Sequence, residues 1–327
     1  MPSFSSLVLL ALLPLVARAA PYSTVRRHQN VSLETRTTYT LKDHYTGKDF
    51  LDWDFFSASD PTHGNVNFLT KSEATSKGLA YVQADGTTIL ATDSTTKLKA
   101  GDNRDSIRIS SPKSYNSGLF IADIWAMPHG PTVWPAYWTV GPNWPNDGEI
   151  DIIEGVGDST SNQMTLHTSS GCSLATSAVS DFTGKHTSTT NCASGAGNNN
   201  GCGVTDFAPN VYGHEFNVVA GGVYAHVVAD SGISIWHFSR DAIPADITEQ
   251  KPNPAGWGKP AAFFSSAACD ISQHFKDHVL TFDTTLCGDW AGAAFPGGPS
   301  ACAAAVADPS NFAVAKWQLN YVSVYES

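Results

Sequence analysis

Short segments rich in β-branched and aromatic residues recur along this chain, and Gly, Asn, Asp or Pro bounds each of them. This pattern predicts antiparallel strands, whereas helical periodicity is scarce. We therefore expect an all-β fold. The clearest predicted strands are residues 117–125, 215–219, 223–228, 233–238 and 316–325.

Two of these predictions are specific enough to be tested by a structure. Asp230-Ser231-Gly232 separates two predicted strands and indicates a hairpin turn. In the last strand, Trp317, Leu319 and Tyr321 alternate with other residues, so we expect all three on one face. That strand would tie the end of the chain into a sheet.

The chain shows no internal repeat and no long linker. The polar stretch 193–201 is interpreted as a loop, because Cys192 and Cys202 flank it. We expect one catalytic domain over residues 35–327, built as a jelly-roll sandwich of two antiparallel sheets. A barrel of similar strand content is an alternative that the pattern leaves open.

The first residues have the layout of a secretory signal peptide. An apolar run from Leu7 to Val16 precedes the small-residue stretch 17–20, which predicts a signal peptide over residues 1–19. The run has about half the length that a spanning helix needs, so a signal anchor is the weaker alternative. Residues 20–34 would be a pro-segment cut at Arg26-Arg27 or an N-terminal extension, and Asn30 begins a glycosylation sequon. We expect a secreted, extracellular protein.

Charge excludes two classes of partner. The formal net charge is −11, and no extended Lys/Arg cluster is present. Nucleic acids and anionic membranes are therefore poor partners, and we expect a soluble monomer.

The six cysteines all lie in the second half of the chain. An even number in a secreted protein predicts disulfides, and the lack of a C-x-x-C pair argues against a zinc or redox site. We expect Cys287 to pair with Cys302, because the loop between them is rich in Gly, Ala and Pro. The sequence leaves the other pairs open.

Residues 148–155, Gly-Glu-Ile-Asp-Ile-Ile-Glu-Gly, place three acids in an otherwise apolar run. In a regular strand Glu149 and Asp151 would share one face, and Glu154 would lie on the other with two isoleucines. Burying an unpaired carboxylate costs several kcal/mol. A β-bulge near Ile152-Ile153 would bring all three acids to one face and leave isoleucine to pack behind.

Crowded carboxyls on one face suit glycoside hydrolysis, in which one acid attacks the sugar and another donates a proton. A solvated acidic strand and a calcium site are the alternatives, and the neighbouring isoleucines argue against the first. Three tryptophans precede the acids, and their rings can stack on sugars. We predict substrate contacts for Trp144, on a loop rich in Pro, Asn and Gly, and for Trp138; the alternative for a tryptophan in such a fold is a place in the core.

The segment Glu149-Ile-Asp-Ile-Ile-Glu154 also matches the E-x-D-x-x-E signature of family-16 glycoside hydrolases. Residues 50–56, 60–64, 118–130 and 287–290 resemble the fungal endo-1,3(4)-β-glucanase, or laminarinase, group of that family. These stretches span most of the chain in the family's order. The resemblance implies a β-jelly roll with an open groove on its concave face.

The resemblance also implies roles for individual residues. Glu149 matches the nucleophile, Glu154 the acid/base, and Asp151 the acid that orients the nucleophile. His167 matches a histidine on the neighbouring strand that faces the acid/base. Trp290 resembles an aromatic residue that stacks on substrate at the end of the cleft.

Two of these positions, and the further candidate Arg108, have other readings. A strand histidine such as His167 is more often structural, and Trp290 could instead cover the core. Arg108 is either a donor to sugar hydroxyls or a surface residue.

The implied activity is retaining, internal cleavage of a β-1,3-glucan such as laminarin, with β-1,6-branched or mixed β-1,3/1,4 glucans as further substrates. No organic cofactor is implied, and no Asp-rich loop identifies a calcium site. One alternative is a cell-wall transglycosylase that uses the same carboxylates. The bulged signature and the lack of a Ser/Thr-rich tail favour hydrolysis. The other is a non-catalytic glucan-binding protein, which would not need three acids.

A protease or esterase has little support, because the sequence contains neither G-x-S-x-G nor H-E-x-x-H.

Overall fold

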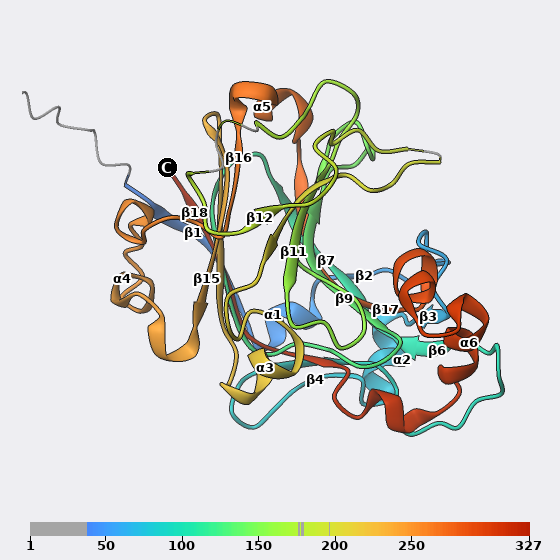
Figure 1. The fold of residues 1–327 in the computed structure, drawn as a ribbon. Coiled ribbons are helices and arrows are strands. Elements are labelled where there is room, and N and C mark those ends of the chain that lie inside the picture. The colour runs from blue at the N-terminus through green and yellow to red at the C-terminus, as the bar shows by residue number, and fades with distance from the viewer. Residues whose placement is uncertain (1–37, 176, 178–179, 196) are drawn as a thin grey trace, which may run out of the picture. The chain divides into compact units, whose positions relative to one another are not determined.

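Two large antiparallel sheets pack face to face in the computed structural model (Figure 1). The structure describes residues 38–175, 177, 180–195 and 197–327. The expected all-β jelly-roll sandwich is confirmed. The predicted signal peptide, Arg26-Arg27 and Asn30 lie outside the described residues. No helix in the described part of the chain is long and apolar enough to cross a membrane.

The first sheet forms the back of the sandwich. Its strands follow the order β16-β15-β14-β8-β18-β5-β4, with β1 paired to β18. The pairing of Ala229 with Gly232 leaves Asp230 and Ser231 as the turn, so the predicted hairpin is confirmed. The strands are β1 Thr40–Thr46, β4 Ala80–Val82, β5 Thr88–Ala91, β8 Gly118–Ala126, β14 Gly222–Ala229, β15 Gly232–Ser239, β16 Ala262–Ser265 and β18 Lys316–Glu326.

The second sheet carries the acidic segment, and we call it the catalytic sheet. Its order is β12-β13-β11-β10-β9-β17-β7-β2, so β10 lies near the middle. The strands are β2 Asp54–Phe55, β7 Arg108–Tyr115, β9 Val133–Val140, β10 Glu149–Glu154, β11 Asn162–His167, β12 Lys185–His186, β13 Cys202–Asp206 and β17 His278–Leu286.

Short helices and one small parallel pair, β3 Val66–Phe68 with β6 Arg104–Ser106, connect the sheets. Thr70 and Glu73 form a capping box at the start of α2, in which each side chain accepts from the backbone N–H of the other residue. The helices are α1 Lys48–Leu51, α2 Lys71–Ser76, α3 Gly213–Val218, α4 Ala245–Thr248, α5 Ile271–His274, α6 Gly298–Ala305, η2 Arg240–Ala242, η3 Pro254–Gly256, η4 Ser266–Ala268, η5 Gly288–Gly292 and η6 Pro309–Phe312.

The main core fills the space between the two sheets. Phe120 and Tyr224 contribute from the first sheet, and Tyr137, Ile150 and Phe282 contribute from the catalytic sheet. The Tyr137 and Phe282 rings stack at 4.5 Å between centroids. Because one face of the catalytic sheet is buried in this way, its other face remains for polar side chains.

The prediction of a strand at 215–219 is wrong. The segment forms helix α3, in which Phe216 is buried while Glu215 and Val218 are exposed. Asn217 fixes this helix by accepting from the backbone N–H of Met127 and donating to its carbonyl, each at 2.9 Å. A helix of this length is too short to show helical periodicity, so tertiary contacts decide its conformation.

The prediction that Trp317, Leu319 and Tyr321 share a face is also wrong for Tyr321. The pairing of β18 with β8 shifts between Leu319 and Tyr321. Trp317 and Leu319 therefore lie in the main core, whereas Tyr321 packs against a second cluster on the outer side of the first sheet. The sequence does not reveal this bulge, because apolar residues lie on both faces of the strand.

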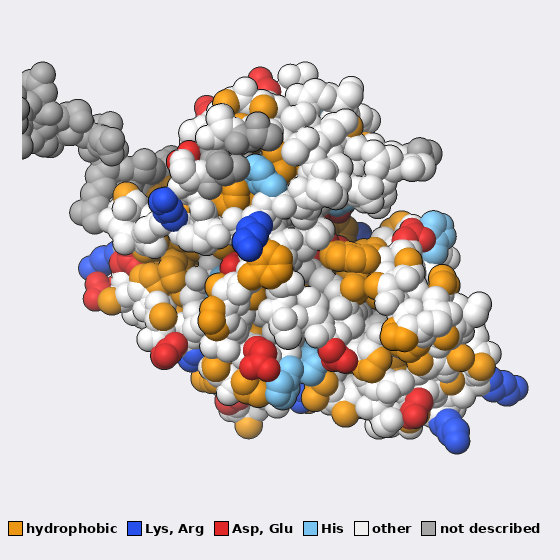
Figure 2. Space-filling model, in the orientation of Figure 1, with side chains coloured by type: hydrophobic (Ala, Val, Ile, Leu, Met, Phe, Trp, Pro, Cys, Tyr) orange, Lys and Arg blue, Asp and Glu red, His pale blue; other side chains and the backbone are white. Residues whose placement is uncertain are grey.

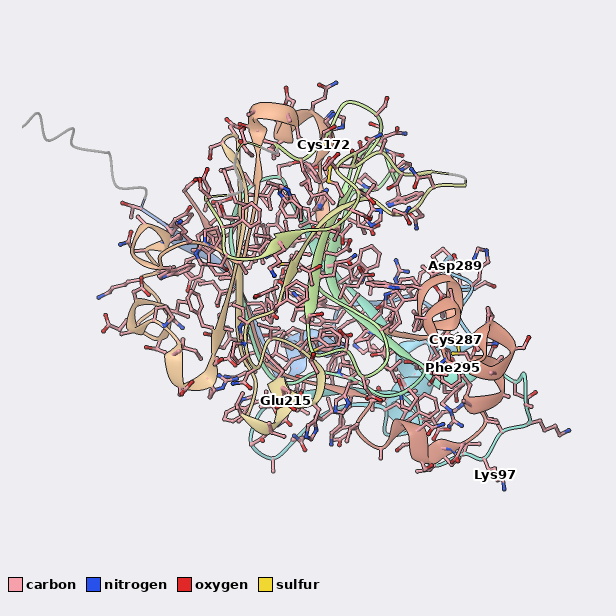
Figure 3. All side chains as sticks on the ribbon, viewed as in Figure 1. Lys97, Cys172, Glu215, Cys287, Asp289 and Phe295 are labelled. Carbon is pink, nitrogen blue, oxygen red and sulfur yellow. A yellow bond between two sulfur atoms is a disulfide. The ribbon has the colours of Figure 1, made fainter. Side chains whose placement is uncertain are left out.

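All six cysteines form disulfides. Cys287–Cys302 is confirmed, and the remaining bonds are Cys172–Cys269 and Cys192–Cys202. Figure 3 shows Cys172 in the upper part of the molecule near α5, and Cys287 in the part that carries η5 and α6. Each bond thus anchors a loop region outside the regular sheets.

A neutral histidine is buried in the core and makes stability depend on pH. The His226 ring on β14 stacks on Phe120 at 4.5 Å, and neither of its nitrogens has a hydrogen-bond partner among the described residues. Burial, and then the neighbouring His278, lower the pKa of His226 to about 3. The unfolded chain takes up a proton near pH 6.5, and the folded one does not. This contribution to stability is therefore full above pH 6.5 and is lost as the pH falls toward 3.

Replacing His226 by Phe should remove this acid sensitivity. Between pH 7 and pH 4.5 the variant should gain roughly 2–3 kcal/mol in free energy of unfolding relative to the unchanged protein. Urea unfolding at both pH values measures this difference. His214 is exposed and provides the control, since His214→Gln should follow the unchanged protein. Parallel pH profiles for His226→Phe and the unchanged protein would contradict the prediction.

Candidate active site

Strand β10 contains the predicted bulge. Its pairing with β9 shifts between Asp151 and Ile153, so Ile152 is the extra residue. Ile150, Ile152 and Ile153 are all buried in the main core. The bulge therefore resolves the parity problem as expected, with isoleucine packed behind the acids.

Asn162 on the neighbouring strand β11 satisfies the backbone of this bulge. Its side-chain oxygen accepts from the backbone N–H of Glu154 at 2.9 Å, and its side-chain nitrogen donates to the carbonyl of Ile152 at 2.8 Å. Both groups would otherwise lack ladder partners. The buried side-chain amide of Asn162 thus fixes the backbone of β10 between Ile152 and Glu154.

The three acids lie on the outer face of the catalytic sheet. Asp151 is 2 % exposed, whereas Glu149 and Glu154 are partly exposed. This face opens toward the hollow that Figure 2 shows between the upper part of the molecule and the part that carries η5 and α6. The carboxyls are therefore accessible to a ligand from one side.

Two tryptophans lie beside Glu154. The indole N–H of Trp134, on β9, donates to Glu154 Oε1 at 2.9 Å. Trp290 in η5 packs edge-on against Trp134, with 5.7 Å between ring centroids. The structure thus places the predicted residue Trp290 at the site, one side chain away from a carboxylate.

His167 lies opposite Glu149 on the neighbouring strand β11. Its Nε2 is 3.4 Å from Asp151 Oδ2 and 3.9 Å from Glu149 Oε1. His167 lies on the strand next to β10, as the resemblance implies. Its contacts, however, are with Glu149 and Asp151 rather than with Glu154. The cause is the pairing register, which places His167 at the Glu149 end of β10.

The other nitrogen of His167 is held from outside the sheet. His167 Nδ1 and Ser194 Oγ are 2.8 Å apart. Ser194 lies in the loop that the Cys192–Cys202 disulfide closes. A partner on Nδ1 fixes the ring orientation and directs Nε2 toward the acids.

Crowding and burial raise the pKa values of all three acids. Burial, and then the nearby Asp151, raise the pKa of Glu149 to about 8. Burial and then Asp283 raise the pKa of Asp151, and burial and then Asp151 raise the pKa of Glu154. Groups so close together titrate as a set, so at least one carboxyl keeps its proton near neutral pH.

The groups that lower the pKa of each glutamate distinguish Glu149 from Glu154. His167, Arg108 and Trp144 all lower the pKa of Glu149. For Glu154 the opposing groups are Trp134 and His167. Because the Arg108 guanidinium acts on Glu149 and not on Glu154, Glu149 is the better placed of the two glutamates to hold a negative charge.

Arg108 and Trp138 lie side by side on the same face. The Arg108 guanidinium carbon is 4.8 Å from the centroid of the Trp138 ring and 4.4 Å from that of Phe56. Arg108 Nε is buried and has no hydrogen-bond partner in the described part of the chain. A buried donor of this kind can bind a ligand hydroxyl. Trp138 pairs directly with Asp151 in the sheet, and Arg108 acts on the charge of Glu149, so the structure places both predicted residues near the acids.

Trp144 lies on the loop between β9 and β10. Its side chain is 40 % exposed, and its indole lowers the pKa of Glu149, which places it next to that carboxyl. An exposed aromatic ring beside an acid is a suitable sugar platform.

The sequence reasoning missed four residues of the site. Trp134 was visible in the tryptophan-rich run, but it was not singled out. Asn162, Ser194 and Asp283 are isolated polar residues without a local motif. Asp283 on β17 pairs with Arg108, and burial raises its pKa to about 7 against the lowering effect of that arginine.

Three of the same residues are close enough together to offer ligand atoms to one metal ion. Ligand atoms of Glu149, Asp151 and His167 lie within 4.8 Å of one another. Acids with raised pKa values keep protons and are poor ligands, since metals bind the deprotonated form. A metal ion at this position would have to displace protons from these carboxyls.

Comparisons with known proteins agree with this geometry. A family model described as the XgeA-like catalytic domain of glycoside hydrolase family 16 matches residues 53–325. An endo-1,3(4)-β-glucanase of Arthroderma benhamiae is 41 % identical over 88 % of this chain and 65 % of its own length. A probable glycosidase of Schizosaccharomyces pombe is 40 % identical over 93 % of this chain and 73 % of its own length. A probable endo-1,3(4)-β-glucanase of Aspergillus niger is 41 % identical, but the chain spans only 40 % of that relative.

Solved structures give the same result over their whole lengths. An elongating family-16 β-1,3-glucosyltransferase superposes with a TM-score of 0.83 at 41 % identity, covering 88 % of this chain and 100 % of its own. Laminarinase 16A from Phanerochaete chrysosporium, solved with β-glucans in its donor and acceptor sites, superposes with a TM-score of 0.82 at 40 % identity, covering 89 % of this chain and 100 % of its own. The sequence resemblance is thereby confirmed: this chain belongs to glycoside hydrolase family 16.

Proposed function

We propose that this protein is a secreted endo-β-glucanase that hydrolyses internal β-1,3 linkages of glucans, including mixed β-1,3/1,4 glucans, with retention of configuration. The observation that carries the proposal is the bulged strand β10, which brings Glu149, Asp151 and Glu154 to one open face. The names of the relatives, an endo-1,3(4)-β-glucanase and a laminarinase, support the substrate class.

Glu149 is the proposed nucleophile. In the first step its carboxylate forms a bond to the anomeric carbon while the glycosidic bond breaks. Glu154 donates its proton to the departing oxygen, so the leaving sugar departs as a neutral alcohol. Asp151 and His167, which lie against Glu149, would orient that carboxylate.

In the second step Glu154 acts as the base. It takes a proton from water, whose oxygen attacks the anomeric carbon and breaks the ester bond to Glu149. Two inversions give net retention. The Trp134 indole holds one oxygen of Glu154 through both steps.

Substrate would lie across the strands of the catalytic sheet. Trp138, Trp144 and Trp290 are proposed to stack on its sugars, and Arg108 to donate to a hydroxyl. All of these groups come from one chain, which supports action as a monomer. The described residues from 38 to 327 form one compact unit, which supports a single catalytic domain. Three disulfides support secretion, because such bonds persist in oxidising compartments.

Product analysis on linear, branched and mixed-linkage β-glucans tests this proposal. Internal cleavage predicts an early fall in polymer size and oligosaccharides of intermediate length. Absence of new reducing ends from every β-glucan would contradict it. A second candidate, β-1,3-glucosyl transfer, is favoured by the likeness to the elongating transferase. Products longer than the starting oligosaccharide, at the expense of hydrolysis, would identify that activity.

A further inference from the structure

An aromatic side chain is exposed at one edge of the catalytic sheet. Phe207, which directly follows β13, is 61 % exposed and is the most exposed large hydrophobic residue in the described part of the chain. Leaving an aromatic ring in water forgoes the free energy of its burial. Such a ring is available to a ligand that can cover it.

The strand register places Phe207 on the same face as the catalytic acids. Asp151 pairs with Thr165, and Gln163, two residues away on the same strand, pairs with Thr205 of β13. Because side chains alternate along a strand, Thr205 and Phe207 point to the outer face with Asp151. Val204, between them, is fully buried in the core, which agrees with this alternation.

Lys185 joins the same face from the last strand of the sheet. It pairs with Thr205, and its Nζ lies 5.4 Å from the centroid of the Phe207 ring. A cation over the ring holds the aromatic side chain in place. The N–H groups of the Lys185 ammonium can also donate to hydroxyl oxygens.

We propose that Phe207 and Lys185 form an outlying saccharide subsite, which takes a sugar of the glucan chain beyond those that contact the carboxylates. The inference rests on the proposed function. β13 is two strands away from β10, and the register places Phe207 nearly level with Glu154, so the subsite lies about 10 Å across the strands from Glu154 and farther from Glu149. It extends the site past β11, on the side away from Trp138 and Arg108. In Figure 1, β12 and β11 lie at the near edge of this sheet.

The chemistry of the subsite suits a neutral β-glucan. The flat ring offers its face to the apolar C–H surface of a pyranose, as aromatic residues do in sugar sites. Gln163 is partly exposed between the subsite and the acids, and its side-chain nitrogen donates to the hydroxyl of the buried Thr165 at 3.2 Å. A glucan chain that crosses the sheet would therefore pass the polar side chain of Gln163 before it reaches the aromatic ring.

Chain-length dependence tests the subsite. We expect Phe207→Ala to lower the ratio of kcat/KM on long laminarin to that on the shortest cleaved oligosaccharide by about fivefold, mainly through KM, because one stacking contact is lost. Phe207→Trp should restore the ratio. Tyr81 is 40 % exposed on β4 of the other sheet, and Tyr81→Ala is the matched control that should leave the ratio as it was. Equal ratios for Phe207→Ala and Tyr81→Ala would overturn the inference.

A binding measurement separates this inference from the proposed function. Glu149→Gln and the double variant Glu149→Gln/Phe207→Ala are run in native gels that contain laminarin. The subsite predicts weaker retardation of the double variant, whether or not the unchanged protein hydrolyses glucan. Retardation that depends on Phe207, in a protein without hydrolytic activity, would reject the hydrolase and keep the subsite. Hydrolysis combined with equal retardation of both variants would reject the subsite alone.

Discussion

Glu149→Gln is expected to lower kcat on laminarin by roughly 10⁴-fold or more, because a neutral amide cannot form the glycosyl ester. Binding should persist, since the aromatic and hydroxyl-binding side chains are unchanged. Reducing-end assays over long incubations measure the loss. Glu215→Gln on α3 is the matched control, because Glu215 is exposed and lies on an element outside the catalytic sheet.

The same substitution should make the protein more stable at neutral pH. The pKa of Glu149 is about 8 in the folded protein, so its stabilising contribution is full below about pH 4.5 and is lost as the pH rises toward 8. Replacing the acid removes this penalty, and the free energy of unfolding should rise by on the order of 1–3 kcal/mol at pH 8 but hardly at pH 4. Urea unfolding at both pH values checks the sign. If Glu149→Gln were inactive and its free energy of unfolding were lower than that of the unchanged protein, the loss of activity would not support a catalytic role.

Glu154→Gln is expected to lower kcat/KM on laminarin by roughly 10²–10⁴-fold, because the leaving sugar then departs without protonation. The loss should be much smaller for a β-glucoside with an acidic phenol as leaving group, since that group needs no proton. Azide should accelerate the variant on the phenyl substrate, because the anion attacks the glycosyl-enzyme without a base. The expected product is a β-glycosyl azide.

This leaving-group dependence is what separates Glu154 from Glu149. Glu149→Gln should be equally inactive on both substrates, because the bond to the nucleophile is lost in every case. If Glu154→Gln lost the same factor on laminarin and on the phenyl glycoside, and azide had no effect, Glu154 would not be the acid/base.

The sequence indicated the site because its three acids do not fit the side-chain alternation of a regular strand. Glu149, Asp151 and Glu154 cannot share a face of a regular strand, and this conflict predicted the bulge at Ile152. In β18 the corresponding shift near Leu319 was missed, because either register would bury apolar residues. A bulge can thus be inferred where a charged residue would otherwise be buried, and not where both faces are apolar.

The supporting residues could not be found in the same way. Ser194 reaches His167 through a disulfide-closed loop, and Asp283 reaches the site through the pairing of β17 with β9. Both contacts join residues that are distant in the sequence, and a single Ser or Asp in a polar or β-branched stretch carries no signal of its own. The pair Lys185 and Phe207 is likewise brought together by strand pairing alone.

The anomeric configuration of the first product tests the central claim most directly. Proton NMR during the first minutes of laminarin cleavage, before mutarotation, distinguishes the two anomers of the new reducing end. Double displacement at Glu149 with Glu154 as acid/base predicts that the β-anomer appears first and the α-anomer follows as the signal equilibrates. If the α-anomer appeared first, water would attack directly, and Glu149 could not be the nucleophile.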